Sequence, residues 1–200
     1  MTENTIALAA DSALLVIDVQ KGFDDASFWG PRDNPAAEGN IAALMDAWQR
    51  TGRPVVLVRH ASRPGSVLAP DHPGHAFKDF VEERRGQEAL LVTKTVNSAF
   101  YGTPDLGDWL TASGIRQLVV AGIQTNMCVE TTARMAGNLG YEVLLPLDAT
   151  HTFDLAGPGG LSLTARELAA ATAVNLQGGG FARVVSTAQL LDACASRAAA

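Results

Sequence analysis

An acid, an amine and a thiol each follow a short apolar run of this sequence. Asp18 comes directly after LLVI, Lys94 comes directly after LLVT, and Cys128 lies a few residues beyond LVVAG, where a helical pattern begins. Each residue alone has an ordinary explanation, because strand ends often carry Asp in turns or solvated Lys, and a buried Cys usually fills space. Their shared position after apolar runs instead favours a common site.

The chemistry of such a site follows from the three residue types. A thiol in the first turn of a helix lies near unpaired N–H groups and a partial positive charge, so we predict a lowered pKa for Cys128. The same N–H groups can stabilise the oxyanion of a tetrahedral intermediate. Asp18 can accept the thiol proton, and Lys94 can keep that carboxylate ionised. We therefore predict that Cys128 attacks a carbonyl carbon.

Strands of a parallel sheet would place these residues together. Short, apolar and largely β-branched runs are typical of strands that are buried on both faces. Such runs occur at 13–19, 54–58, 89–92, 117–121, 142–147 and 181–185. In open parallel sheets, side chains at the carboxyl ends of the strands meet in the crevice where ligands bind.

Helical patterns lie between the predicted strands. Ile41, Leu44, Met45 and Trp48 share one helical face. Further helices are predicted to begin at Thr103-Pro104, at the possible capping box Thr164/Glu167, and at Thr187. Alternating strands and helices predict an α/β fold, a three-layer α/β/α sandwich with a mostly parallel six-stranded sheet, in a single domain spanning 1–200.

Composition narrows the class of function. The chain has 200 residues, of which 47% are hydrophobic and 18% charged, enough for one sizeable core. A formal net charge of −6 without a dense Lys/Arg run disfavours nucleic-acid binding and favours small-molecule substrates. Two cysteines outside any zinc or disulfide pattern, and apolar runs far short of a membrane span, predict a cytoplasmic protein with no membrane partner.

Four segments resemble those of the isochorismatase-like cysteine hydrolases, a family that includes nicotinamidases and N-carbamoylsarcosine amidases. The matching stretches are VIDVQKGF (16–23), VTKTVNSAFYGT (92–103), VVAGIQTNMCVETTARMAGNLGYEV (119–143) and LDAT (147–150). The resemblance implies a Rossmann-like sheet with strand order 3-2-1-4-5-6 and a catalytic triad of Asp18, Lys94 and Cys128. It also implies a thioester intermediate that water hydrolyses, with release of ammonia or an amine.

The resemblance carries three further implications. A non-proline cis peptide bond would join Ile123 to Gln124, and the backbone amides of Gln124 and Cys128 would form the oxyanion hole. The third strand would be separated from the first by the second, so Lys94 would have to reach back to Asp18. Members commonly form dimers or tetramers, so a homo-oligomer is expected.

A small pocket is expected around the triad. Aromatic and polar residues close to the motifs are candidates for binding substrate, namely Phe23, Asn97, Phe100, Tyr101 and His60, although an ordinary core or interface position is the alternative for the aromatic ones.

No metal or other cofactor is predicted. Nicotinamidases place an Asp-x-His pair after the second strand to bind a divalent metal, whereas this chain has Arg59, His60 and Ala61 there. Asp71, His72 and His75 lie in the Pro/Gly-rich segment 61–78, which is more typical of a solvated loop or lid than of a metal site.

Three other classes of protein fit parts of the pattern less well. A dinucleotide-binding enzyme is disfavoured because the first strand is followed by DVQKGF and not by G-x-G-x-x-G. An isochorismatase-type vinyl-ether hydrolase would use Asp18 as an acid but would not need the thiol, and a non-catalytic oligomeric binding protein would not need the triad. The sequence therefore predicts a cysteine-dependent hydrolase of a linear C–N bond in a small amide, carbamoyl or ureido compound.

Overall fold

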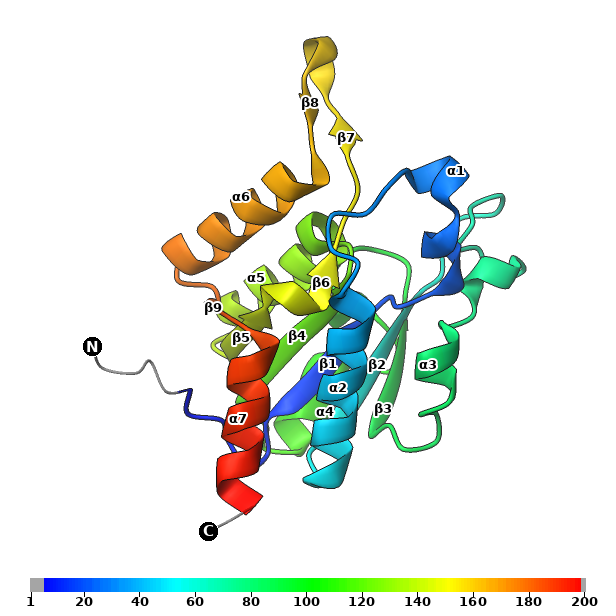
Figure 1. Ribbon diagram of the computed structural model, residues 1–200. Helices are drawn as coiled ribbons and strands as arrows, with labels where there is room; N and C mark the ends of the chain where they lie inside the picture. Colours follow the sequence, from blue (N-terminus) through cyan, green and yellow to red (C-terminus); the bar gives the residue numbers. More distant parts are fainter. Residues whose placement is uncertain (1–5, 199–200) are drawn as a thin grey trace.

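A parallel sheet forms the centre of the molecule. The computed structural model describes residues 6–198, and these contain the strand order β3-β2-β1-β4-β5-β9, with the short β6 paired to the end of β4 (Figure 1). The strands are β1 (Ala13–Ile17), β2 (Val55–His60), β3 (Leu90–Lys94), β4 (Gln117–Ile123), β5 (Glu142–Pro146), β6 (Thr150–His151) and β9 (Arg183–Val185). All the pairs in this sheet are parallel. The predicted strand order is confirmed, and β6 is an addition to it.

Helices cover both faces of the sheet, as the three-layer prediction required. One face packs against α2 (Ala37–Arg50), α3 (Asp79–Glu82) and α7 (Thr187–Ala198). The other packs against α4 (Leu106–Ala112), α5 (Glu130–Asn138) and α6 (Ala165–Gly178). The short helix α1 (Ala26–Trp29) lies in the connection from β1 to α2.

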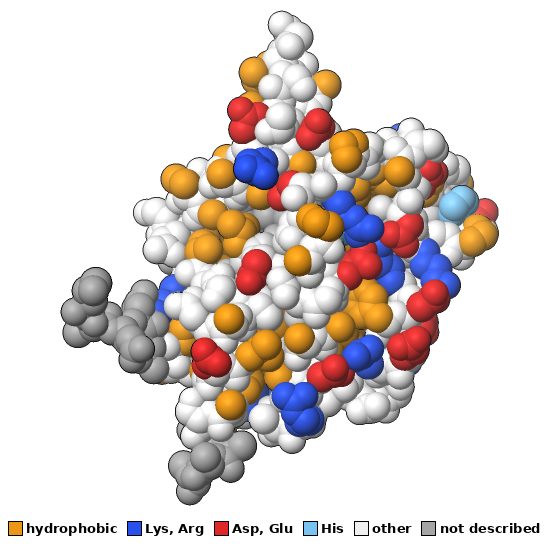
Figure 2. Space-filling model, viewed as in Figure 1, with side chains coloured by type: hydrophobic (Ala, Val, Ile, Leu, Met, Phe, Trp, Pro, Cys, Tyr) orange, Lys and Arg blue, Asp and Glu red, His pale blue; other side chains and the backbone are white. Residues whose placement is uncertain are grey.

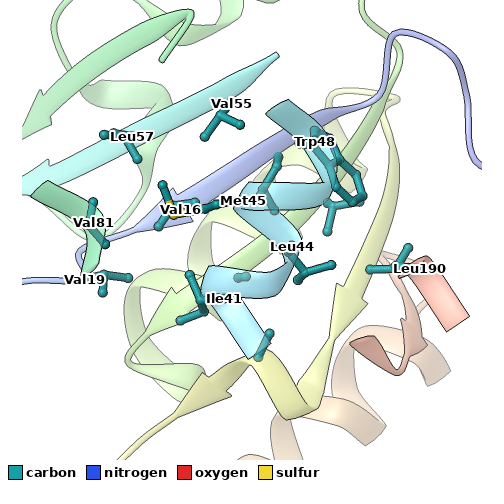
Figure 3. Packing of buried hydrophobic residues seen from close by; sticks show 14 of the residues in the cluster. Val16, Val19, Ile41, Leu44, Met45, Trp48, Val55, Leu57, Val81 and Leu190 are labelled. Carbon is teal, nitrogen blue, oxygen red and sulfur yellow. The ribbon is translucent and has the colours of Figure 1, made fainter. Parts of the chain in front are cut away.

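Strand β1 shows why the strands are continuously apolar. Leu14 and Val16 belong to the cluster under α2, whereas Leu15 and Ile17 belong to the cluster on the opposite face, and all four side chains are fully buried. Alternate side chains of a strand point to opposite faces, so a sheet covered on both sides needs apolar residues at every position. Figure 3 shows the α2 side of this packing, where Ile41, Leu44, Met45 and Trp48 lie over the strands.

The helix starts were predicted in part. The capping box at Thr164 and Glu167 is present before α6. At α4, however, the side chain of Asp105 caps the helix by accepting from the N–H of Asp108, so the predicted start at Thr103 is wrong. Before α7, the Ser186 hydroxyl accepts from the Gln189 N–H, and the predicted cap Thr187 is instead the first helical residue.

Two segments lie outside the regular strands and helices of the sandwich. The 61–78 segment packs back on the β1 end, because Phe77 bridges to Gln20 and is fully buried, and the Lys78 N–H donates to the Val19 carbonyl at 3.0 Å. A hairpin of β7 (Leu155–Ala156) and β8 (Ser162–Leu163) projects away from the body (Figure 1). Among the described residues, no helix has the length and apolar character needed to cross a bilayer.

Candidate active site

Asp18 stands at the carboxyl end of the central strand β1. Its backbone has a φ of +52°, and its N–H donates to the Val58 carbonyl at 2.9 Å. Asp tolerates this left-handed conformation better than most residues do. The chain therefore turns at Asp18 as it leaves the sheet, and the side chain is fully buried.

Lys94 crosses the end of β2 to reach Asp18. It is the last residue of β3, two strand spacings or about 10 Å away in the sheet. Its Nζ lies 2.6 Å from Oδ2 of Asp18, and both side chains have no exposed surface. The long lysine stem thus connects two strands that are not neighbours.

Cys128 completes the group from the other side of β1. It lies in a π-helical turn (Thr125–Val129) between β4 and α5, and 8% of the residue is exposed. Its Sγ, a carboxylate oxygen of Asp18 and a ring nitrogen of His60 all lie within 4.8 Å of one another. The structure therefore brings the predicted acid, amine and thiol together at one edge of the sheet.

The thiol is not activated in the way the sequence predicted. Burial, followed by the negative charge of Asp18, raises the pKa of Cys128 to about 12, and only the Lys94 ammonium opposes this effect. The predicted lowering of this pKa is therefore wrong, because desolvation of the sulfur outweighs the helix terminus. The resting group is a neutral thiol, whose proton has to leave as the sulfur attacks.

His60 is a fourth member of the group. It is the last residue of β2, and its Nδ1 lies 3.0 Å from Lys94 Nζ and 3.8 Å from Asp18 Oδ2. Burial and then the Lys94 charge lower the pKa of His60. His60 was predicted to lie in the pocket, but its contact with Lys94 was not, although the side-by-side pairing of β2 with β3 could have suggested it.

The turn expected to form the oxyanion hole follows β4. The peptide bond between Ile123 and Gln124 is cis, and the Gln124 carbonyl accepts from the N–H groups of Met127 and Val129. The use of the Gln124 and Cys128 amides as oxyanion donors stays a prediction.

Comparison with known proteins shows the family to which this chain belongs. The model of the isochorismatase domain matches residues 12–189, which include Asp18, Lys94 and Cys128. The chain belongs to the isochorismatase family. It is a hydrolase by that membership.

Relatives of this family member cover most of its length. The uncharacterized isochorismatase family protein YrdC of Bacillus subtilis is 42% identical over 144 residues, 72% of this chain and 75% of that protein. Nicotinamidase 3 of Arabidopsis thaliana is 32% identical over 194 residues, covering 90% and 86% of the two chains. Streptothricin hydrolase of Streptomyces noursei is 38% identical over 161 residues, 79% of this chain, and the match spans 61% of its length.

A solved structure supports the same fold. A putative hydrolase of the isochorismatase family from Chromobacterium violaceum is 42% identical, with a TM-score of 0.90 over 98% of this chain and all of that one.

Within residues 6–198 of this isochorismatase-family chain, a lysine lies beside the one group of potential metal ligands. Asp18, His60 and Cys128 are the only described residues that form such a group. The Lys94 ammonium lies 2.6 Å from the first and 3.0 Å from the second, so a metal ion there would meet a positive charge. Asp71, His72 and His75 do not gather into a ligand group within the described chain.

The remaining residues predicted to bind substrate differ in how deeply they are buried. Phe23 is 6% exposed and its ring centre lies 5.1 Å from that of Trp29. Phe100 belongs to the core cluster on the α4 side, with its ring 5.9 Å from that of Tyr141, a residue at the opposite end of the sheet from Asp18. Asn97 is exposed and Tyr101 is 70% exposed. Phe100 is therefore placed as a core residue, and Asn97 and Tyr101 as surface residues.

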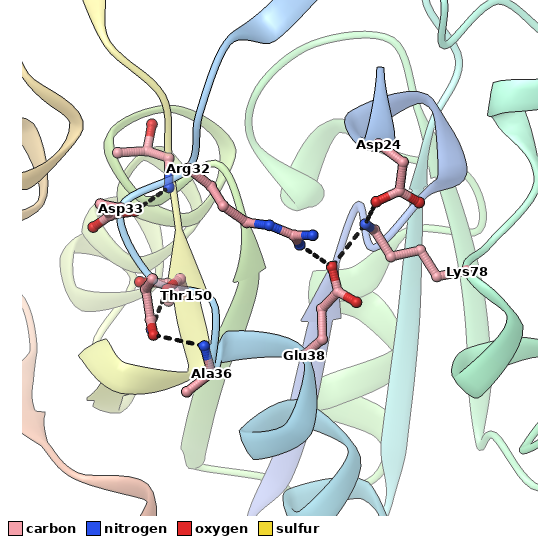
Figure 4. A network of polar contacts seen from close by, with 9 residues as sticks. Asp24, Arg32, Asp33, Ala36, Glu38, Lys78 and Thr150 are labelled. Carbon is pink, nitrogen blue, oxygen red and sulfur yellow. Dashed lines mark hydrogen bonds and ion pairs between the residues drawn. The ribbon is translucent and has the colours of Figure 1, made fainter. Parts of the chain in front are cut away.

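Sequence reasoning missed a second polar cluster beneath the α1 connection. Lys78 is 4% exposed and contacts Asp24 and, at 2.8 Å, Glu38, which also pairs with Arg32 (Figure 4). The fully buried His151 lies near these charges, and burial lowers its pKa to about 3. Neither ring nitrogen of His151 has a hydrogen-bond partner among the described residues.

Proposed function

We propose that this protein is a cysteine-dependent hydrolase that cleaves a linear C–N bond in a small amide, carbamoyl or ureido compound through a thioester intermediate. The observation that carries this proposal is the buried Lys94–Asp18 pair, 2.6 Å apart, beside the sulfur of Cys128. Such a site offers a nucleophile, a proton acceptor and a fixed positive charge within one small volume.

The proposed reaction begins with proton transfer. Because the pKa of Cys128 is raised to about 12, the thiol gives its proton to the Asp18 carboxylate as the sulfur attacks the carbonyl carbon. The carbonyl electrons move to oxygen, where the amides of Gln124 and Cys128 would stabilise the charge. Lys94 balances the charges of the carboxylate and the sulfur.

The second half returns the enzyme to its starting state. The tetrahedral intermediate collapses, the C–N bond breaks, and the leaving nitrogen takes the proton from Asp18. Water then gives a proton to the restored carboxylate while its oxygen attacks the thioester carbon. The C–S bond breaks, and the thiolate recovers the proton from Asp18.

The Cys128 sulfur also separates this proposal from the two alternatives. In vinyl-ether hydrolysis by protonation the thiol would have no role. In a non-catalytic binding protein the buried lysine and aspartate would have no role. Nicotinamidase 3, a relative at 32% identity, supports amide chemistry by its name.

Ammonia release tests the proposed reaction. A panel of nicotinamide, carbamoyl amino acids, ureides and simple amides is incubated with wild type, Cys128→Ala and Cys194→Ala. The matched control is Cys194, the other free and buried cysteine. Turnover should survive in Cys194→Ala and vanish in Cys128→Ala, and mass spectrometry should detect acylation of Cys128 in wild type. Turnover that persists in Cys128→Ala would refute the thioester route.

We further propose that the chain works as a homo-oligomer, a dimer or a tetramer. The projecting β7–β8 hairpin carries Leu155 and Leu161, which are 44% and 57% exposed, and Figure 2 shows hydrophobic side chains on this projection. An isolated two-stranded hairpin is only marginally stable, so packing against a second copy would stabilise it. The cytoplasmic location predicted from the sequence stays a prediction.

A further inference from the structure

His60 and Lys94 leave adjacent strands at the same level. The register of β2 and β3 pairs His60 directly with Lys94. Paired residues of neighbouring strands project to the same face, so the imidazole lies alongside the lysine stem. The contact of 3.0 Å between Nδ1 and Nζ therefore follows from the sheet and does not depend on a surface loop.

The direction of this hydrogen bond fixes the state of the imidazole. An ammonium group has three donors and no acceptor, so Nδ1 of His60 must accept and must carry no proton. The ring proton of the neutral imidazole is then on Nε2. The lowered pKa of His60 agrees with a neutral ring.

Two fixed acceptors now hold the ammonium. Asp18 Oδ2 and His60 Nδ1 receive two of its three N–H bonds, at 2.6 and 3.0 Å. A lysine head on a flexible four-carbon stem would otherwise sample several positions. With two donors engaged, the ammonium is confined to the space between Asp18, His60 and the Cys128 sulfur.

The backbone of His60 is itself anchored. The buried side chain of Gln20 accepts from the His60 N–H at 2.8 Å and donates to the His60 carbonyl at 3.0 Å. The same amide donates to the His75 carbonyl at 2.9 Å, which joins the 61–78 segment to the site. The position of the imidazole is thus set by a buried clamp.

The free end of the ring remains available. Within the described residues, Nδ1 makes the only hydrogen bond of the His60 ring, and 14% of its side chain is exposed. A neutral Nε2–H on that ring is a donor with no acceptor among the residues that the structure describes. It suits a carbonyl or carboxylate oxygen of a bound molecule.

We propose that His60 is a positioning residue, whose Nδ1 holds the Lys94 ammonium between Asp18 and Cys128 and whose Nε2–H binds an oxygen of the substrate. This inference rests on the proposed function and deepens it. The ionisable groups that face the ring are Lys94 from β3, Asp18 from the end of β1, Cys128 from the π-helical turn and His75 from the 61–78 segment.

Two substitutions distinguish the roles of the two ring nitrogens of His60. His60→Asn places an amide oxygen near the position of Nδ1 and removes the Nε2 donor. His60→Gln places an amide nitrogen near Nε2 and removes the Nδ1 acceptor. His60→Leu, of similar volume, removes both.

The first readout needs no substrate. The rate of Cys128 alkylation by iodoacetamide is measured from pH 7 to 10 in a Cys194→Ser background. His60→Asn should stay within about threefold of the parent, whereas His60→Gln and His60→Leu should be about tenfold slower, because a thiol pKa one unit higher leaves a tenth of the thiolate. Equal rates in all four proteins would overturn the positioning role. If His60→Leu fails to fold, His60→Gln carries the comparison.

The second readout uses any substrate that the ammonia panel identifies. His60→Asn should raise KM with a smaller loss of kcat, whereas His60→Gln should lower kcat with a smaller change of KM. The same KM and kcat effects in both variants would refute the division between the two ring nitrogens. If wild type releases no ammonia from any compound, the proposed function fails, yet the alkylation rates still decide the role of His60 toward Lys94.

Discussion

Asp18 and Lys94 form a buried ion pair, and removing one member would leave the other without its opposite charge. Removing one member of such a pair leaves an uncompensated charge and typically costs about 3–5 kcal/mol of stability. Asp18→Asn should therefore abolish turnover and lower the free energy of unfolding by about that amount. Urea unfolding at pH 7 measures the loss.

The double variant separates stability from catalysis. Asp18→Asn combined with Lys94→Met removes both charges, so it should be more stable than Asp18→Asn alone and remain inactive. A double variant as unstable as the sum of the two single variants would show that the pair is not energetically coupled.

The raised pKa of Cys128 has a direct kinetic consequence. Only the thiolate reacts with iodoacetamide, and a pKa of about 12 keeps its fraction small at every pH below 10. The alkylation rate of Cys128 should therefore rise about tenfold per pH unit from pH 7 to 10. Peptide mass spectrometry distinguishes this site from Cys194. A plateau reached below pH 9 would contradict the neutral resting thiol.

His151 should make the fold sensitive to mild acid. Burial lowers its pKa from 6.5 to about 3. Between these two pH values His151 is therefore protonated in the unfolded chain and neutral in the folded chain. Stability from this residue is complete above pH 6.5 and falls with decreasing pH, by up to about 1.4 kcal/mol per unit. Urea unfolding measured between pH 6.5 and 5 should show that the free energy of unfolding falls less steeply with decreasing pH in His151→Leu than in wild type. An unchanged slope would show that His151 does not contribute.

The contact between β1 and β4 requires a glycine beside the site. Gly122 has a φ of +131°, and a Cβ there would lie 2.1 Å from the Ile17 carbonyl oxygen. Gly122→Ala should force the two strands apart, cost more than about 3 kcal/mol and disturb the Asp18 turn. Urea midpoints and ammonia release measure both effects.

Gly140 provides a matched control for this substitution. It also has a positive φ, +88°, but a Cβ there would meet no atom within 4 Å. Gly140→Ala should cost only the conformational strain, about 1–2 kcal/mol, and leave activity unchanged. Equal losses for both variants would show that strain, and not the approach of Ile17, is the cause.

The elements were predictable from the sequence wherever local pattern decides structure. The apolar runs around Val16 and Val119 are typical of buried strands, and Thr164 with Glu167 could form a capping box without any distant contact. Thr103 was a plausible cap too, but Asp105 competed with it two residues later, and local pattern does not rank two such caps.

The details of the site depend on contacts that no local pattern encodes. His60 meets Lys94 only because β2 and β3 pair in one register, and a sequence does not state that register. The predicted direction of the Cys128 pKa shift was wrong, because this pKa depends on how deeply the π-helical turn buries the sulfur. The aromatic residues near the motifs could not be divided into core, such as Phe100, and surface, such as Tyr101.

The topology of the sheet explains why the site needs distant parts of the chain. Strand β1 lies between β2 and β4, so the end of β1 is flanked on one side by His60 and on the other by the turn that carries Cys128. Lys94 comes from one strand further and supplies the positive charge between them. The group of Asp18, His60, Lys94 and Cys128 is thus a product of the strand order and cannot form in any single segment.

The projecting β7–β8 hairpin allows a test of the proposed homo-oligomer. If a second copy covers β7 and β8, burial of Leu155 and Leu161 stabilises the assembly, and charged residues there oppose it. Light scattering after size exclusion should give a multiple of the chain mass for wild type and a single chain for Leu155→Asp/Leu161→Asp. Leu139→Asp, at a leucine that is 53% exposed at the end of α5, should leave the wild-type mass unchanged. A wild type that stays a single chain at every concentration would exclude the oligomer, whereas an assembly that survives the double substitution would place its interface elsewhere.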